Sequence, residues 1–400
     1  MMVFPIRTNR ENIPKAMVKY ATAIPLESVV DILADVTAPD TPINSVSLKN
    51  VELSVIEIHV VSRATEVPFS VEDAGRNAEY ALANTLPVVN QDTALNYRWI
   101  DTRTPANQAI FRIQSGVCAL FREFFMNRGF VEVHTPKLIA GSSEGGANIF
   151  KLNYFDQNAC LAQSPQLYKQ MTSACGGFDR VFEIGPVFRA EDSNTHRHLC
   201  EFTGLDFEMC IYEHYYEALD VMGEMFNYIF DGIYEKFAAE LQTISVQYPF
   251  EPIKYLRPPL RIDYAEGIAL LNAAGITEAS VEEDLSTPHE KALGKIVKEK
   301  YGTDFYIMVS TAEITTTLSL RYFTISYLEL NICIHLRTNI PWLPDPFTQC
   351  LVLIIQSFPT LMICSSEARK SSVVLSVSMI TICYINKVHF VYWHVPSLLS

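Results

Sequence analysis

The residues most able to do chemistry lie between Val181 and Met209, in a segment that reads as two strands joined by a polar loop. Alternate side chains of a strand point to one face, so Arg189 and Glu191 share a face of the first strand. The second strand places one aromatic ring and two carboxylates on a common face: Phe202, Asp206 and Glu208. Arginine suits phosphate, an aromatic ring suits a base, and carboxylates suit amines or Mg²⁺. The segment therefore predicts an ATP site.

Three sequence motifs indicate which family of ATP-binding proteins the segment resembles. FRAE (Phe188–Glu191) resembles motif 2 of the class II aminoacyl-tRNA synthetases. GSSEGGANIF (Gly141–Phe150) and AQSPQLYKQM (Ala162–Met171) precede it in the order that the family has. Together the three motifs resemble those of the aspartyl-tRNA synthetases of the eukaryotic cytosolic type. The resemblance extends from about residue 17 to residue 307. The resemblance implies an α/β (α+β) fold, with an antiparallel sheet flanked by helices and preceded by a partial OB-fold β-barrel.

The resemblance also implies a two-step acyl transfer that uses ATP and Mg²⁺. The carboxylate of L-aspartate attacks the α-phosphorus of ATP, and tRNA(Asp) then takes the aspartyl group. Arg189 is the expected catalytic residue, because its planar guanidinium matches the α-phosphate oxygens. The other residues expected at ATP lie in or after the polar loop: Glu191, Arg197, His198, Leu199 and Phe202. Taken alone, His196 and His198 would be solvated imidazoles, and the motif changes this interpretation for His198 only.

Aspartate carries one ammonium and two carboxylates, so its pocket must hold charges of both signs. The resemblance implies that Lys169 binds the side-chain carboxylate. The residues implied around the α-ammonium and the neighbouring wall are Glu144, Gln163, Ser164, Gln166 and Asp206. The two glycines of SEGGAN (Ser143–Asn148) indicate a loop that closes over the substrate. Glu208 is the candidate ligand for Mg²⁺.

Composition and termini restrict the class of protein. A formal net charge of −14 argues against generalised binding to polyanions. The nine cysteines show no zinc-site spacing, which fits reduced thiols in a reducing compartment. The first residues contain no apolar stretch typical of a secretory signal. We therefore expect a cytoplasmic protein with no membrane association.

Periodicity predicts the elements that must position the site. Thr104 and Pro105 resemble a helix N-cap and first turn, and Gly129 ends the helix that follows. The expected elements after it are a strand at 130–135 stopped by Pro136, a helix from 214 to about 241, a strand at LRIDYAEGIALL (260–271) and a polar loop at 280–290. GFVEVHTPKL resembles motif 1, which implies a homodimer with Pro136 at its interface.

The chain divides into four expected regions. They are a partial OB-fold anticodon-binding domain at 1–85, a connector at 86–103, a class II catalytic domain at 104–308 and an apolar tail at 309–400. In the first region apolar and polar residues alternate between 27 and 70, as in a small β domain. A β-meander without RNA contacts is the alternative for this region.

The tail differs from the rest of the chain. Only nine charged residues follow residue 308, compared with 67 before it, and the apolar runs show little strand or helix periodicity. Pro359 interrupts the first run, which disfavours a membrane span. We interpret the tail as unrelated sequence and expect that it does not pack as an extension of the catalytic domain. Motif 3, the downstream acidic Mg²⁺ ligands and the arginine that recognises the aspartate side chain have no counterpart in it.

Three functions remain open at this level. The first is an aspartate–tRNA ligase whose activity is impaired in this chain, with other synthetases as possible partners in a complex. The second is a catalytically inactive synthetase unit that binds ATP or a partner subunit. The third is an asparaginyl, lysyl or asparagine-synthesising relative. Lys169 disfavours a lysine substrate, because the two ammonium groups would repel each other.

Overall fold

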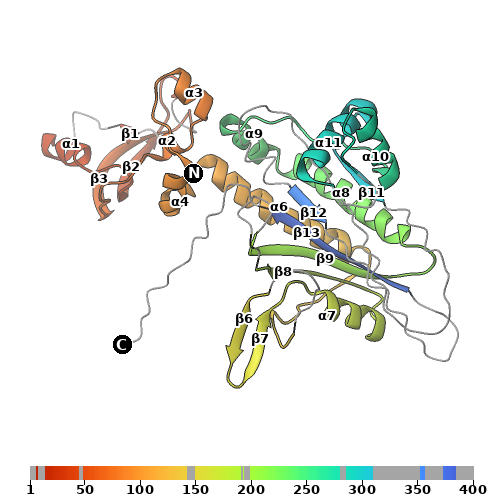
Figure 1. Cartoon of the computed structure of the whole chain (residues 1–400). Coiled ribbons are helices and arrows are strands. Elements are labelled where there is room, and N and C mark those ends of the chain that lie inside the picture. Colours follow the sequence, from red (N-terminus) through yellow and green to blue (C-terminus); the bar gives the residue numbers. More distant parts are fainter. Residues whose placement is uncertain are drawn as a thin grey trace, which may run out of the picture. The chain divides into compact units, whose positions relative to one another are not determined.

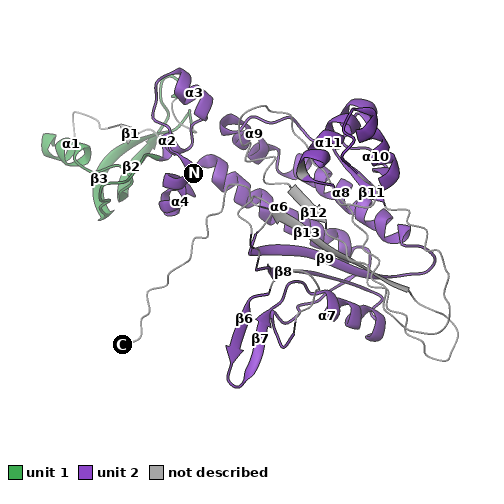
Figure 2. Cartoon of the chain, viewed as in Figure 1, with its two compact units in different colours: residues 1–70 green, residues 71–400 purple. Residues whose placement is uncertain are grey.

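The computed structural model describes residues 6–7, 14–44, 48–141, 149–190, 192, 199–279, 285–309, 352–355 and 373–383. For residues 6–7, 352–355 and 373–383 it describes only the backbone strands. The chain forms two compact units, residues 1–70 and residues 71–400 (Figure 2). None of the helices in the described part of the chain is both long and apolar enough to cross a bilayer.

The first unit is a small three-stranded sheet with one helix. Its elements are β1 (Ile6–Arg7), α1 (Lys15–Thr22), β2 (Val29–Thr37) and β3 (Glu52–Ser62). β3 is central, pairing antiparallel with β2 and parallel with β1. The alternation in the sequence thus corresponds to strands, whereas closure into an OB-fold barrel stays a prediction.

The second unit begins with four short helices and continues into the elements of the site (Figure 1). The short helices are α2 (Val71–Ala74), α3 (Ala78–Ala83), α4 (Gln91–Asn96) and α5 (Arg98–Asp101). A small antiparallel sheet is made of β5 (Leu138–Ile139), β6 (Lys151–Tyr154) and β7 (Gln157–Leu161). It leads into α7 (Gln166–Gln170) and a π-helical turn, η1 (Met171–Cys175).

The central sheet has the order β12-β13-β9-β8-β4. Its strands are β4 (Val131–Glu132), β8 (Arg180–Phe188), β9 (Glu201–Ile211), β12 (Val352–Ile355) and β13 (Val373–Cys383). β4 pairs parallel with β8, and the other pairs are antiparallel. The expected mixed fold with an antiparallel sheet is therefore confirmed.

The helix expected after Thr104 is α6 (Pro105–Met126). The Thr104 hydroxyl accepts a hydrogen bond from the Asn107 amide at 3.4 Å, and Pro105 occupies the first turn. Beyond the helix, Gly129 takes the left-handed conformation with φ +75°, which favours glycine. Thr104 and Gly129 thus bound the helix as the sequence predicts. The apolar residues of α6 face the core.

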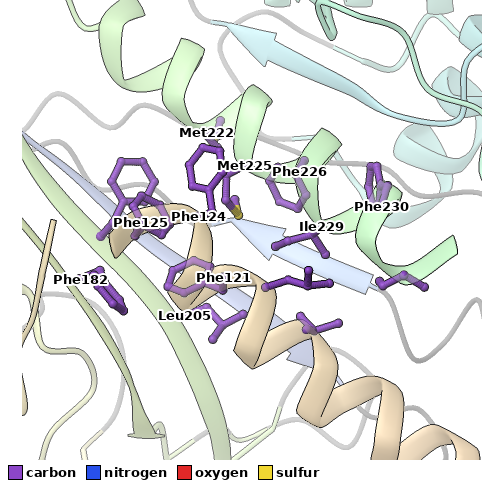
Figure 3. Close-up of a cluster of buried hydrophobic side chains, with 14 of the residues drawn as sticks. Phe121, Phe124, Phe125, Phe182, Leu205, Met222, Met225, Phe226, Ile229 and Phe230 are labelled. Atoms are coloured by element: carbon purple, nitrogen blue, oxygen red, sulfur yellow. The ribbon is translucent and has the colours of Figure 1, made fainter. Parts of the chain in front are cut away.

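The main core lies between α6, α8 (Tyr216–Lys236) and one face of the central sheet (Figure 3). Phe125 is central to it, with its ring centroid 5.6 Å from that of Phe182 on β8 and 4.9 Å from that of Phe207 on β9. Leu205, Phe207 and Met209 all belong to this cluster. Because these alternate residues of β9 face the helices, the residues between them face the other side of the sheet.

The helix expected from 214 to about 241 is instead two helices. α8 ends at Lys236, Phe237 adopts φ −124° and ψ 27°, and α9 (Ala238–Gln247) follows. The break turns the Phe237 ring onto α6 at Gly116, where an added Cβ would lie 2.2 Å from the ring. A tertiary contact therefore overrides a continuous helical pattern.

A second core surrounds a parallel strand pair, β10 (Leu260–Asp263) and β11 (Tyr306–Val309). The strand expected at 260–271 ends at Asp263, whose carboxylate caps α10 (Tyr264–Ala273) by accepting from the Ala265 amide at 2.8 Å. The polar loop expected at 280–290 becomes helical from Thr287, as α11 (Thr287–Tyr301). Both corrections have one cause: Asp263 and Ser286 are helix N-caps.

The expectation that the tail does not pack on the catalytic domain is wrong for two of its segments. β13 pairs antiparallel with β9, from Val373 opposite Ile211 to Thr381 opposite Gly204, and β12 pairs with β13. The run VLSVSM within 374–379 does alternate apolar and polar residues, and the edge of β9 offers unpaired backbone groups to such a strand. The rest of residues 310–400 lies outside the described part of the chain.

Candidate active site

The candidate site lies on the face of the β8–β9 hairpin that points away from the main core. In the register of the two strands Glu183 is opposite Asp206, Gly185 is opposite Gly204, and Val187 is opposite Phe202. One face of the sheet therefore carries these six residues, with the apolar partners of the helices on the other. The polar face is as expected from the alternation in the sequence.

Arg189 and Phe202 meet at one end of this face. The Arg189 amide donates to the Cys200 carbonyl at 2.9 Å, which extends the ladder one step beyond the end of β8. The guanidinium carbon lies 5.9 Å from the centroid of the Phe202 ring, and Arg189 is only 9% exposed. A cation and an aromatic face are thus placed side by side, the pair that a nucleotide's phosphate and base require.

Lys169 lies against the other end of the face. Its ammonium is 3.2 Å from Asp206 Oδ1, 3.3 Å from the Phe207 carbonyl oxygen and 3.8 Å from Glu208 Oε2. The side chains of Lys169 and Glu208 are fully enclosed, and that of Asp206 nearly so. A buried cation of this kind needs opposite charge close by, and here two carboxylates supply it.

The segment that leads into α7 brings further predicted residues to the same place. Gln163, Ser164 and Gln166 are all buried, and the Gln166 amide donates to Ser164 Oγ at 3.4 Å. Backbone bonds hold this segment to β8, because the Phe188 amide donates to the Ala162 carbonyl at 3.0 Å. The turn of chain before Lys169 is therefore fixed to the strand that precedes Arg189.

The remaining predicted residues are less closely tied to this face. Leu199 is partly buried just before β9, and Pro136 is exposed between β4 and β5. Four predicted residues lie outside the described part of the chain: Glu144, Glu191, Arg197 and His198. Their assigned roles, like that of Pro136 in a dimer interface, stay predictions.

Glu208 does not fit a Mg²⁺ site held by the protein. Its carboxylate is enclosed and lies 3.8 Å from the Lys169 ammonium, which would repel a second cation. Within the described ranges no group of three or more His, Cys, Asp or Glu side chains is arranged to hold a metal.

The thiol of Cys210, two residues after Glu208, is 3.7 Å from Ser173 Oγ. Burial raises the pKa of Cys210, which makes it a poor nucleophile.

Two functional candidates were missed by the sequence interpretation, Glu183 and Lys137. The Glu183 carboxylate is nearly enclosed, and it accepts from the Lys137 ammonium at 2.6 Å and from the Thr135 amide at 3.1 Å. Glu183 shares the parity of Arg189 on β8, so the alternation alone places it on the polar face. The local pattern does not indicate that Glu183 is buried or that it pairs with Lys137, which lies 46 residues earlier.

A comparison with family models gives the decisive match. Residues 90–330 match the model of the tRNA synthetases class II (D, K and N). The chain belongs to this class II synthetase family. The match runs to residue 330, past residue 308, where the resemblance was expected to end. The FRAE motif contains Arg189, which lies at one end of the hairpin face described above.

Individual relatives of this class II synthetase are similar over most of the chain. The cytoplasmic aspartate–tRNA ligase of Homo sapiens is 52% identical over 295 residues, which cover 74% of this chain and 58% of that protein. A crystal structure of a putative aspartyl-tRNA synthetase from Leishmania major Friedlin has 43% identity and a TM-score of 0.68, covering 74% of this chain and 63% of that one. Asparaginyl-tRNA synthetase of Pyrococcus horikoshii, complexed with asparaginyl-adenylate, has 26% identity and a TM-score of 0.60, covering 76% and 64%. The chain thus spans about six tenths of the length of the curated relative.

Proposed function

We propose that this chain is an aspartate–tRNA ligase whose site is built to activate L-aspartate with ATP and pass it to tRNA(Asp), and that this activity is impaired in the chain as written. The observation that carries the proposal is the shared face of the β8–β9 hairpin. Arg189 and Phe202 lie at one end of it and the Lys169–Asp206 pair at the other. A nucleotide group and an amino-acid group bound at the two ends would meet between them.

The charges at the second end favour a dicarboxylic amino acid. Lys169 offers a positive charge to a side-chain carboxylate, and Asp206, with Gln166 and Ser164 beside it, offers acceptors to an α-ammonium. A lysine substrate would bring a second ammonium to an enclosed cation, which is unfavourable. Support also comes from the relatives named aspartate–tRNA ligase at about half identity. Glu144 is proposed to join this pocket.

At the first end, Arg189 is proposed to neutralise the α-phosphate while Phe202 stacks on adenine. Positioning and charge neutralisation would do most of the chemical work, because attack of a carboxylate on phosphorus needs two anionic groups brought together. Further ATP contacts are proposed from the loop and its flanks: Glu191, Arg197, His198 and Leu199. Class II synthetases use Mg²⁺ with ATP in general. Glu208 does not fit the ion, because the Lys169 ammonium lies 3.8 Å from it, so no step is assigned to Mg²⁺.

The proposed partners follow from the same family. We expect a homodimer with Pro136 at its interface, tRNA(Asp) bound in part by the first unit, and a cytoplasmic location like that named for the relatives. We also propose assembly with other synthetases in a complex. Size-exclusion chromatography with light scattering measures the first of these directly.

One observation favours a second function, a synthetase unit that binds ATP and a partner subunit without catalysis. β13 is the neighbour of β9 in the sheet, and its segment VVLSVSMITIC contains no charged residue. β13 thus has no cationic residue in its sequence, whereas a departing pyrophosphate requires positive charge for its neutralisation.

Calorimetric titration separates these functions from unrelated ones. L-Aspartate and ATP should each bind the purified chain, while L-lysine should not. Binding of ATP without binding of L-aspartate would select the second function. If neither L-aspartate nor ATP binds, both proposed functions are refuted.

A further inference from the structure

The ion pair between Lys137 and Glu183 has more contacts than neutralisation requires. Glu183 Oε1 accepts from the Lys137 ammonium at 2.6 Å and from the Thr135 amide at 3.1 Å, while Oε2 accepts from the Thr135 hydroxyl at 2.8 Å. The Lys137 ammonium also donates to Thr135 Oγ1 at 2.8 Å. The carboxylate is thereby fixed in orientation as well as in charge.

A glycine makes room for this pair on the sheet. An added Cβ at Gly185 would lie 2.9 Å from Glu183 Oε1 and 3.3 Å from Lys137 Cε. The lysine stem therefore crosses β8 at a position where a side chain would push the pair apart. Glu183 is also directly opposite Asp206 in the register. Like charges opposite each other are unfavourable, and each carboxylate here has its own lysine.

The backbone of Lys137 reaches a second part of the site. Its carbonyl accepts from the Ala162 amide at 2.8 Å, and the Ala162 carbonyl accepts from the Phe188 amide at 3.0 Å. Ala162 begins the segment that carries Ser164, Gln166 and Lys169, and Phe188 is followed by Arg189. One lysine thus joins β8 through its side chain and the amino-acid segment through its backbone.

We propose that Lys137 and Glu183 are positioning residues that set the separation between the ATP end and the amino-acid end of the site. The inference rests on the proposed function, because only a reaction that joins two ligands needs that separation fixed. Reacting atoms must come within about 3–3.5 Å, and a displacement of about 1 Å can cost about 10²-fold in rate. Loss of the pair should therefore act on a ligand that spans both ends, and much less on a ligand that occupies one.

The chain offers a closely matched control pair, Lys298 and Asp304. Their ion pair is 2.8 Å long, with side chains 16% and 2% exposed, compared with 2.6 Å, 18% and 3% for Lys137 and Glu183. Asp304 also accepts a backbone amide, that of Lys254, at 3.0 Å. The control pair lies between α11 and the segment before β11, away from the hairpin face. Because its burial is nearly the same, loss of this pair measures purely structural damage.

The test compares a spanning ligand with its two halves by calorimetry. The spanning ligand is aspartyl-sulfamoyl-adenosine, a non-reacting analogue of aspartyl-adenylate, and the halves are ATP and L-aspartate. For Lys137→Met and Glu183→Gln we expect about 10-fold or greater weakening for the analogue and less than about 3-fold for each half. Lys298→Met should leave all three affinities within about 3-fold. Thermal melts of every variant identify any that is unfolded. If Lys137→Met is unfolded, the isosteric Glu183→Gln still provides the comparison.

Two results would overturn the inference while leaving the proposed function intact. One is an analogue affinity that falls no more than the affinities of its halves. The other is an equal loss in Lys298→Met, which would make the effect structural. A parent chain that binds neither half would instead overturn the proposed function, and with it this inference.

Discussion

Lys169 and Asp206 form an ion pair that is closed to solvent, with Nζ and Oδ1 3.2 Å apart and side chains 0% and 2% exposed. Each partner is held by other groups, Lys169 by the Phe207 carbonyl and Asp206 by its place in the middle of β9. Such a pair contributes little net stability compared with apolar residues, but removal of one partner leaves a buried charge uncompensated. The pair is therefore costly to disturb.

Lys169→Met should destabilise the fold strongly. The change removes the cation that lies 3.2 Å from Asp206 and 3.8 Å from Glu208, and breaking an enclosed pair in this way is expected to cost about 3–5 kcal/mol in the free energy of unfolding. Urea denaturation followed by circular dichroism measures it. Lys236→Met, which breaks the exposed pair with Glu123, should change stability little. Equal losses for both variants would contradict the enclosed pair.

Arg189→Ala should weaken ATP binding without unfolding the chain. Loss of a charge-assisted contact with phosphate is expected to cost about 1.5–3 kcal/mol in binding free energy. Isothermal titration with ATP gives this value. Arg261→Ala is the matched control, because Arg261 lies over an aromatic ring in a similar way, 5.4 Å from the centroid of Tyr216. Unchanged affinity in Arg189→Ala would remove Arg189 from the nucleotide site.

Gly116→Ala should disturb the contact between α6 and α9. An added Cβ would lie 2.2 Å from the Phe237 ring, and overpacking of this kind costs about 1–3 kcal/mol. In a Phe237→Ala background the same substitution should cost much less, because the ring that it strikes is gone. A double-mutant cycle from denaturation curves measures this coupling. Additive effects would show that the ring is not the obstacle.

The alternation of residues in the hairpin was enough to predict which side chains share a face. Asp206 and Glu208 do lie together against Lys169, and Arg189 does lie beside Phe202. A period of two is a local property, so it is visible in the sequence. The resemblance to a family then supplied Lys169, which no local pattern would have selected.

Other features depend on contacts between distant residues and were not visible. The break at Phe237 exists because the ring packs on Gly116, more than a hundred residues earlier. The enclosure of Glu183 depends on Lys137, and the pairing of β13 depends on the free edge of β9. The wrong predictions of a strand at 260–271 and a loop at 280–290 had a local cause. Asp263 and Ser286 are N-cap residues that indicate the start of a helix in the sequence itself.

The cysteines should differ in reactivity. Burial raises the pKa of Cys210, so its thiolate fraction at a given pH is lower than that of an ordinary thiol, whereas Cys175 is exposed. At pH 8 iodoacetamide should label Cys175 within minutes and Cys210 only after addition of denaturant. Peptide mass spectrometry distinguishes the two sites. Rapid labelling of Cys210 in the folded chain would contradict its burial.

The chain as written should show little or no aspartate-dependent ATP–pyrophosphate exchange. Motif 3 of the class II synthetases is rich in glycine and ends in an arginine, yet no glycine follows Gly302 in this chain. The strand beside β9, β13, has no charged residue either. Loss of one preorganised charge contact typically costs about 10²–10³ in rate, and here both the arginine and the acidic Mg²⁺ ligands lack a counterpart.

A graft provides the decisive form of this last prediction. Replacing residues after Met308 with the C-terminal segment of an aspartate–tRNA ligase should restore exchange, because the β8–β9 face already carries the groups for the α-phosphate and the substrate carboxylate. The same graft in an Arg189→Ala background should remain inactive, which ties the recovered activity to this chain's own hairpin. Exchange by the unmodified chain at a rate like that of the graft would contradict this prediction, because it would show that the missing charges are supplied elsewhere in the chain.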